Sequence, residues 1–198
     1  LRDESYADVC FEVEGEELRA HAAILVARCG HFRRMFRSGM AECRVERGGA
    51  GSSGGGGASD GDMPVPIRRV RITDCGREAF AQLLLWLYSG SLQPDLPTED
   101  LATVLRLADV YGLPSLGEAC ERALISHIDV DSVVALLQVG LAAQASDLED
   151  SCLRFAVDHV AVVRRHQTYQ DCRDPDVLRR VAVAWASELE YVREHSHL

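Results

Sequence analysis

The sequence predicts an α+β protein in which a small sheet near the start of the chain is followed by helices. Apolar and polar residues alternate over Asp8–Glu14 and again over Ile67–Thr73, a pattern typical of half-buried strands. Later segments instead carry apolar residues at intervals of three and four, which is the spacing of helices. With 198 residues, 47% of them hydrophobic, the chain suits one domain with an appendage and can bury a sizeable core.

Three strands are expected in this sheet. The first is followed by Gly15, which permits a turn, and then by a return strand on which Leu18 and Ala20 alternate with polar residues. The third spans Ile67–Thr73. The apolar residues that alternate along the three strands are Val9, Phe11, Val13, Leu18, Ala20, Val70 and Ile72.

Helices are expected from Ala22 to Gly39, from Glu78 to Leu92 and over most of the chain after residue 100. Two later helices are expected to begin at capping boxes, Ser115-x-x-Glu118 and Ser146-x-x-Glu149. Another begins at Asp174-Pro175, an N-cap residue followed by proline at the first helical position. The apolar stripe of the first helix consists of Ala22, Leu25, Cys29, Phe32 and Phe36.

A glycine-rich insertion interrupts the predicted sheet between residues 48 and 61. Eight of these fourteen residues are Gly, and the others are Ser, Ala and Asp. Such a segment buries too little apolar surface to offset its ordering entropy, so we expect a disordered loop.

The charge of the chain is acidic and unevenly distributed. There are 31 acidic and 21 basic residues, giving a net charge of −10, which argues against binding nucleic acid or an anionic membrane surface. Residues 28–47 contain six Arg and two Glu, whereas residues 95–150 contain eleven acids and two Arg. This uneven distribution of charge has two interpretations: solvated helix faces, or a polarised surface that orients a partner.

Cysteine usage and motif content favour a non-enzymatic protein of the cytoplasm or nucleus. The seven Cys form no C-x-x-C pair, so we expect reduced thiols. Cys29-x-His31 and His195-x-His197 are potential metal pairs, but neither has a matching second pair, and no metal or cofactor is expected. Neither a G-x-S-x-G elbow nor a Walker loop occurs. A Cys–His dyad assembled by the fold remains the open alternative.

Several linked segments resemble the BTB/POZ domain. Tyr6–Gly15 contains the family's D-V-x-F-x-V-x-G opening, Leu18–Leu25 its A-H-x-x-x-L segment and Arg28–Phe36 its F-x-x-M-F segment. Downstream, Phe80–Leu92 and Leu107–Leu113 resemble its F-x-x-L-L-x-x-x-Y-x-G and A-A-D-x-Y-x-L helices. These motifs occur in the family's order.

The resemblance implies a BTB/POZ fold over residues 1–128, with a small three-stranded sheet flanked by a helical cluster. Residues 129–163 resemble the helix pairs of a 3-box or BACK-type extension, so we expect an all-α extension over 129–198. The whole arrangement is similar to the carboxy-terminal BTB of ankyrin-plus-BTB proteins. Because residue 1 is Leu, we expect the chain to be part of a longer protein.

The resemblance also implies a function in protein–protein interaction. Many family members are substrate adaptors of cullin-3 ubiquitin ligases and touch the cullin through a hydrophobic-x-Glu motif after the first long helix. Met40-Ala41-Glu42 stands at that place. Further cullin contacts are expected from Asp109, Tyr111 and Leu113 and from the acidic residues 129–150, while the substrate would bind outside this chain.

A homodimer is the second partner that the resemblance implies. Ile24 and Met35 form a second apolar line on the first helix, and the position of Ile24 lies at the dimer interface of related adaptors. The alternative to a dimer interface is that this helix is buried on two sides within a single chain.

Three departures from the family pattern bear on these expectations. Ala22 replaces the usual basic residue after His21, few residues precede Tyr6 where an exchanged helix would lie, and the insertion at 48–61 directly follows the cullin motif. The alternative function is a homodimerisation scaffold in transcription or transport that binds no cullin.

Overall fold

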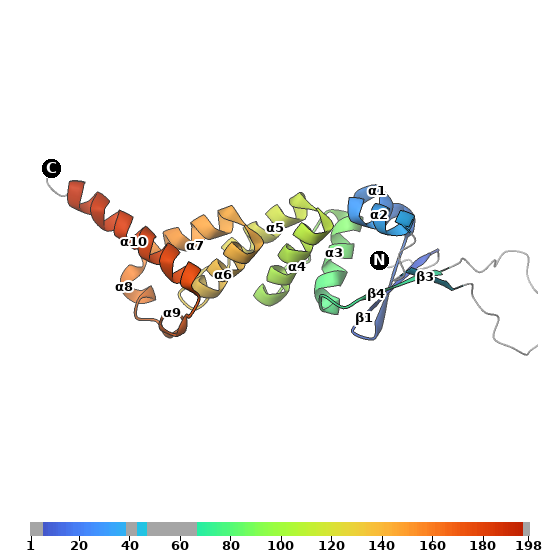
Figure 1. Cartoon of the computed structure of the whole chain (residues 1–198), viewed down its shortest axis with the longest axis horizontal. Coiled ribbons are helices and arrows are strands. Elements are labelled where there is room, and N and C mark those ends of the chain that lie inside the picture. The colour runs from blue at the N-terminus through green and yellow to red at the C-terminus, as the bar shows by residue number, and fades with distance from the viewer. Residues whose placement is uncertain (1–5, 39–42, 47–66, 196–198) are drawn as a thin grey trace, which may run out of the picture. The chain divides into compact units, whose positions relative to one another are not determined.

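The computed structural model describes residues 6–38, 43–46 and 67–195, and the side chains of 6–38 and 67–188 (Figure 1). The chain divides into two compact units. The first contains the described residues up to Leu96 together with Val110–Leu113, and the second contains Pro97–Asp109 and the described chain from Pro114 onward. The expected family boundary between residues 128 and 129 stays a prediction.

A mixed sheet organises the first unit, with its strands in the order β2-β1-β4-β3. β1 and β2 form an antiparallel hairpin whose turn places Glu14 and Gly15 at φ values of 53° and 83°. β4 runs parallel to β1 and antiparallel to β3. The α+β fold class is confirmed. The strands are β1 (Val9–Val13), β2 (Glu16–Ala20), β3 (Cys43–Glu46) and β4 (Ile67–Ile72).

Within the described residues the sheet has four strands, one more than the three expected. The three predicted strands are all present, and β3 is added at the edge beside β4, with Cys43 opposite Val70 and Glu46 opposite Ile67. A strand of four residues contains only two periods of apolar–polar alternation, too few to identify it from the sequence. Its pairing with β4 defines it instead. The glycine-rich insertion predicted at 48–61 lies outside the described residues.

The first predicted helix is in fact two, α1 (Ala22–Arg28) and α2 (Gly30–Ser38). They are separated by Cys29, whose backbone is extended at φ −134° and ψ 118°. A continuous helix would place Gly30 in its interior, where glycine costs roughly 1 kcal/mol relative to alanine. After the break, α2 buries Phe32 and Met35 and leaves Phe36 half-buried.

The motif around His21 ties the start of α1 to α3 (Arg77–Ser89). The backbone N–H of His21 donates to the Tyr88 hydroxyl at 2.8 Å, and the same hydroxyl lies 2.7 Å from His21 Nδ1. The N–H of Ala22 donates to Asp8 at 2.7 Å. These bonds satisfy two N–H groups that the first turn of a helix leaves without intrahelical partners.

Helix α3 matches the predicted segment at 78–92 but ends three residues earlier. Gly90 adopts a left-handed conformation at φ 72°, and its N–H donates to the carbonyl of Trp86 at 2.8 Å, which closes the helix. The helix buries Phe80, Leu83, Leu84 and Leu87 and leaves Tyr88 half-buried.

The second unit is helical, and its described part after residue 128 consists of helices, as expected of the all-α extension predicted over 129–198. Gly140 allows a close approach of two helices, because a Cβ at this position would lie 3.3 Å from the backbone nitrogen of Glu149. None of the described helices is apolar over a length sufficient for a membrane crossing. The helices are α4 (Thr98–Tyr111, whose last two residues belong to the first unit), α5 (Pro114–Ile125), α6 (Val133–Ala143), α7 (Ser146–Asp158), α8 (Val160–Val163), α9 (Gln167–Asp171) and α10 (Pro175–His195).

The predicted helix starts were right in one case and wrong in two. Asp174 caps α10, since its Oδ1 accepts the N–H of Asp176 at 3.0 Å. Helix α5 already begins at Pro114, which places Ser115 inside its first turn. Ser146 is the first residue of α7 and is preceded by Ala145, which makes no side-chain cap. Proline is thus the first residue of α5. In the first turn of α7 the N–H of Leu148 donates to the Glu121 carboxylate of α5 at 3.4 Å, not to a capping box.

Two buried thiols of the second unit make its stability sensitive to alkaline pH. Burial raises the pKa of Cys120 and of Cys152 to about 12, from an ordinary value near 9. Both thiols are therefore neutral in the folded chain at a pH where the unfolded chain ionises them. Their contribution is fully present below about pH 9 and is lost as the pH rises toward 12.

We expect the free energy of unfolding, measured with urea under reducing conditions, to fall between about pH 9 and about pH 10. Each thiol contributes at most about 1.4 kcal/mol per pH unit to this slope. The double substitution Cys120→Ala and Cys152→Ala should make the slope shallower. Val134→Ala, a buried truncation without a thiol, should lower stability equally at every pH. An unchanged slope in the cysteine variant would contradict this assignment.

Candidate partner-binding site

A groove of about 300 Å³ lies in the first unit between α2, the end of β4 and the residues at the end of α4. α2 contributes His31 and Met35, and the end of α4 contributes Val110 and Tyr111. The third wall is the segment from Val70 to Asp74, which comprises the end of β4 and the turn that follows it. Three segments that are distant in the sequence thus form one surface.

The floor of this groove is an aromatic cluster around Tyr111, which is only 4% exposed. Its ring centroid lies 4.5 Å from that of His31, 5.2 Å from that of Phe32 and 6.2 Å from that of Phe80. The thiol of Cys29 donates to the Tyr111 carbonyl at 3.4 Å. Tilted aromatic contacts of this kind add to the stabilisation from buried area, so they help to hold Tyr111 in place.

The charge of the groove comes from its rim. Burial raises the pKa of Tyr111, and the nearby negative charge of Asp74 raises it further, so its phenol is uncharged at neutral pH. Asp74 is exposed at the end of β4. Arg71 also lines the groove, and its guanidinium forms an ion pair with Glu12 at 3.6 Å. The groove therefore combines apolar side chains, such as Met35 and Val110, with the polar and charged side chains of Thr73, Asp74 and Arg71.

The residues expected to bind the cullin take different positions. Asp109 is exposed, whereas Tyr111 and Leu113 are buried in the chain itself. Met40 and Glu42 lie outside the described residues. Tyr111 and Leu113 therefore pack beneath the surface and cannot touch a partner directly. The exposed apolar side chain at the end of α4 is that of Val110, which is 53% exposed.

Sequence reasoning missed Val110 and His31 as surface residues. Val110 follows the charged Asp109 and lies off the buried apolar stripe of α4, a signal that could have identified it. His31 was considered only with Cys29 as a metal pair, but Cys29 is buried against the Tyr111 carbonyl. Within the described part of the chain no three His, Cys, Asp or Glu residues gather as metal ligands.

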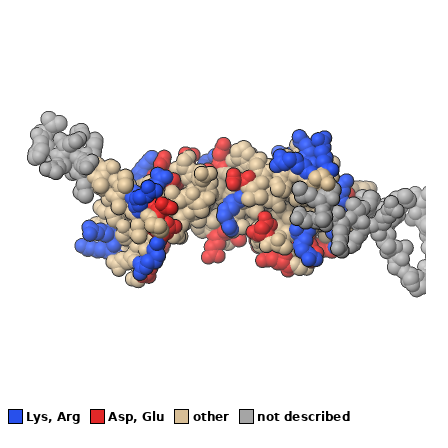
Figure 2. Space-filling view, viewed as in Figure 1, with Lys and Arg blue, Asp and Glu red and all other residues tan. Residues whose placement is uncertain are grey.

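The two residues expected at the dimer interface also differ in exposure. Ile24 on α1 is partly exposed, whereas Met35 on α2 is 8% exposed and lines the groove. Figure 2 shows basic side chains gathered over α1 and α2. The exposed arginines of these two helices are Arg28, Arg33, Arg34 and Arg37.

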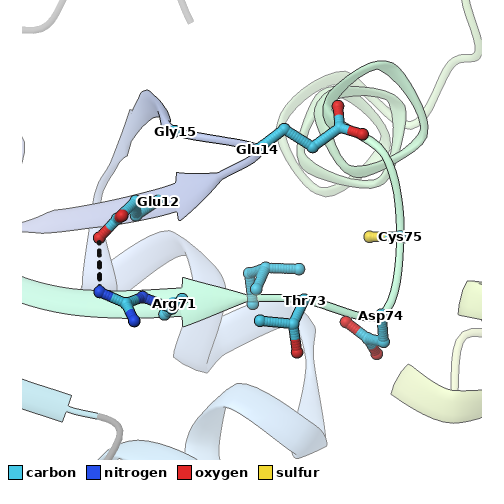
Figure 3. Close-up of a pocket in the computed structure, with 8 residues that line it drawn as sticks. Glu12, Glu14, Gly15, Arg71, Thr73, Asp74 and Cys75 are labelled. Atoms are coloured by element: carbon cyan, nitrogen blue, oxygen red, sulfur yellow. Dashed lines mark ion pairs between the residues drawn. The ribbon is translucent and has the colours of Figure 1, made fainter.

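The first unit has a second hollow, lined in part by Glu12, Glu14 and Cys75 (Figure 3). Its acidic side chains have structural roles. The Glu14 carboxylate accepts the backbone N–H of Arg77 at 3.0 Å, at the start of α3. A carboxylate at this end of a helix is favoured by the helix dipole. Glu12 is likewise paired with Arg71. These acids are accounted for by contacts within the chain.

Comparison with known proteins identifies the fold. The family model of the BTB/POZ domain matches residues 1–50 and 53–128. The chain belongs to the BTB/POZ family. Members of this family are protein-interaction modules and are generally not enzymes.

Similar full-length proteins extend well beyond this BTB/POZ chain. BTB/POZ and MATH domain-containing protein 4 of Arabidopsis thaliana is 28% identical over 188 residues, covering 88% of this chain and 36% of the relative. BTB/POZ domain-containing protein 9 of Drosophila melanogaster is 30% identical over 182 residues, covering 90% of this chain and 22% of the relative. The chain thus spans about a third or less of the length of these two relatives.

Among solved structures, the BTB domain of zebrafish PATZ1 is similar to this BTB/POZ chain, with a TM-score of 0.42 and 16% identity. The alignment covers 60% of this chain and 75% of that chain.

Proposed function

We propose that this BTB/POZ chain is the cullin-binding module of a substrate adaptor for a cullin-3 ubiquitin ligase. The observation that carries the proposal is the groove at Tyr111, because the exposed Val110 beside Met35 suits an apolar side chain of a partner. Arg71, Thr73 and Asp74 at the same groove offer polar contacts. The substrate would bind a region of the full-length protein outside this chain, consistent with relatives that are several times longer.

The roles of the residues within this proposal follow from their burial. Val110 and the exposed carboxylate of Asp109 would touch the cullin directly. Tyr111 holds Val110 in place through its contacts with α2. The motif residues Met40 and Glu42 follow α2 in the sequence and would add an adaptable apolar anchor and a charge-assisted hydrogen bond.

We propose in addition that the chain is a homodimer that uses α1. Because Met35 is buried in its own chain, the surface available to a second copy centres on Ile24, with Ala23 and Ala27 exposed beside it. These three residues form an apolar strip beside the arginines of α1 and α2. A dimer without cullin binding would correspond to the scaffold function.

Removing the motif side chains should weaken cullin binding. Met40→Ala combined with Glu42→Ala is expected to raise the Kd for the cullin-3 amino-terminal domain about thirty-fold, because an interface anchor costs about 2 kcal/mol on truncation. Calorimetry with the whole chain measures this change. Val110→Asp should weaken binding comparably without lowering the melting temperature, since this side chain is half in solvent.

Val183→Asp is the matched control, because Val183 is exposed to a similar degree on α10 and lies outside the groove. It should leave the Kd unchanged. If the unsubstituted chain shows no binding at about 100 μM cullin, an affinity too weak for a stable adaptor complex, the cullin function is wrong and the scaffold function stands.

Self-association should depend on Ile24. In sedimentation equilibrium at micromolar concentration, Ile24→Asp is expected to convert a dimer into a folded monomer, because a carboxylate in an apolar contact loses its hydration without gaining a partner. Val183→Asp serves here as the exposed control. An unsubstituted chain that sediments as a monomer would refute a dimer through α1.

A further inference from the structure

The second unit contains an apolar groove of its own, of about 630 Å³, between α7, α8, α9 and α10. Its apolar lining is contributed by Val157 on α7, Val160 and Ala161 on α8 and Trp185 on α10. Val160 is 40% exposed, so a large apolar side chain faces solvent at the groove. The volume lies in the range of sites that hold a ligand or an anchoring side chain.

The floor of this groove is held in one orientation. The indole N–H of Trp185 donates to the carbonyl of Ala156 at 2.8 Å, and the ring centroid of Tyr169 lies 5.2 Å from that of Trp185. The polar atom of the indole is therefore satisfied within the chain. Its remaining apolar surface is fixed before any partner arrives, which lowers the entropic cost of binding.

Two arginines at the groove give it a charge preference. Arg164 and Arg165 are exposed and line the groove, and neither guanidinium forms an ion pair with any residue that the structure describes. By contrast, Arg179 and Arg180 of the same unit are paired with Asp176 and Glu149. One acidic residue, Glu188, lines the groove. Guanidinium groups that form no ion pair with the described residues, beside an apolar lining, favour carboxylates.

We propose that this groove binds a peptide segment of a partner protein in which a large apolar residue is flanked by Asp or Glu. The apolar side chain would rest on Trp185 and against Val160, and the flanking carboxylates would meet Arg164 and Arg165. A polyphosphate backbone fits less well, because the chain as a whole carries a net charge of −10. The site lies in the second unit and does not depend on cullin binding in the first.

Fluorescence anisotropy with the whole chain tests this proposal. The probe is a labelled peptide of roughly ten residues with a central Leu flanked by Glu, for which we expect a Kd on the order of 10 μM. Arg164→Glu combined with Arg165→Glu should weaken binding at least about tenfold. Val160→Asp should weaken it comparably. Arg154→Glu combined with Arg179→Glu, with the same charge change outside the groove, should leave the Kd unchanged.

Two altered peptides keep the test independent of the stability of the variants. Replacing the central Leu by Ala, or the Glu residues by Lys, should each reduce binding about tenfold or more. Equal binding of the Lys peptide, equal binding of the Ala peptide, or no binding at about 1 mM would each overturn the proposal. Self-association would be measured by sedimentation for each variant. If only Val160→Asp abolishes it, the groove binds a second copy of the chain, and the peptide proposal is overturned.

Discussion

Burial of the Tyr111 ring is the constraint on which the first unit and its groove depend. The ring contacts His31 and Phe32 on α2 and Phe80 on α3, residues separated from it by about 30 to 80 positions in the sequence. Its carbonyl accepts the thiol of Cys29 at the break between α1 and α2. The end of α4 is thereby held against the helices that cover the sheet.

This packing separates the residues that build the surface from those that can touch a partner. Tyr111 and Leu113 belong to one of the segments that resemble the family, yet both are buried. The residue they leave accessible is Val110. A similar division occurs in the second unit, where Trp185 is fixed by a hydrogen bond to Ala156 and Val160 remains exposed beside it. In both units an aromatic side chain held by contacts within the chain lies near an accessible valine, an arrangement suited to apolar anchors.

Local sequence patterns predicted the elements whose formation is itself local. Alternation identified β1, β2 and β4, helical spacing of the apolar residues between Glu78 and Leu92 identified α3, and Asp174 marked the start of α10. The break at Cys29 was missed because Leu25, Cys29 and Phe32 keep helical spacing across it. β3 was missed because pairing with a distant strand defines it. The groove itself was beyond local reasoning, since α2, β4 and α4 meet only in the fold.

A double-mutant cycle between Phe32 and Tyr111 tests most directly whether this aromatic contact joins the end of α4 to α2. The free energy of unfolding would be measured for Phe32→Leu, Tyr111→Leu and the combination of both. Because the rings lie 5.2 Å apart, we expect a coupling energy of about 1 kcal/mol between them. Additive effects, within about 0.5 kcal/mol, would show that the two side chains act independently and would contradict the account.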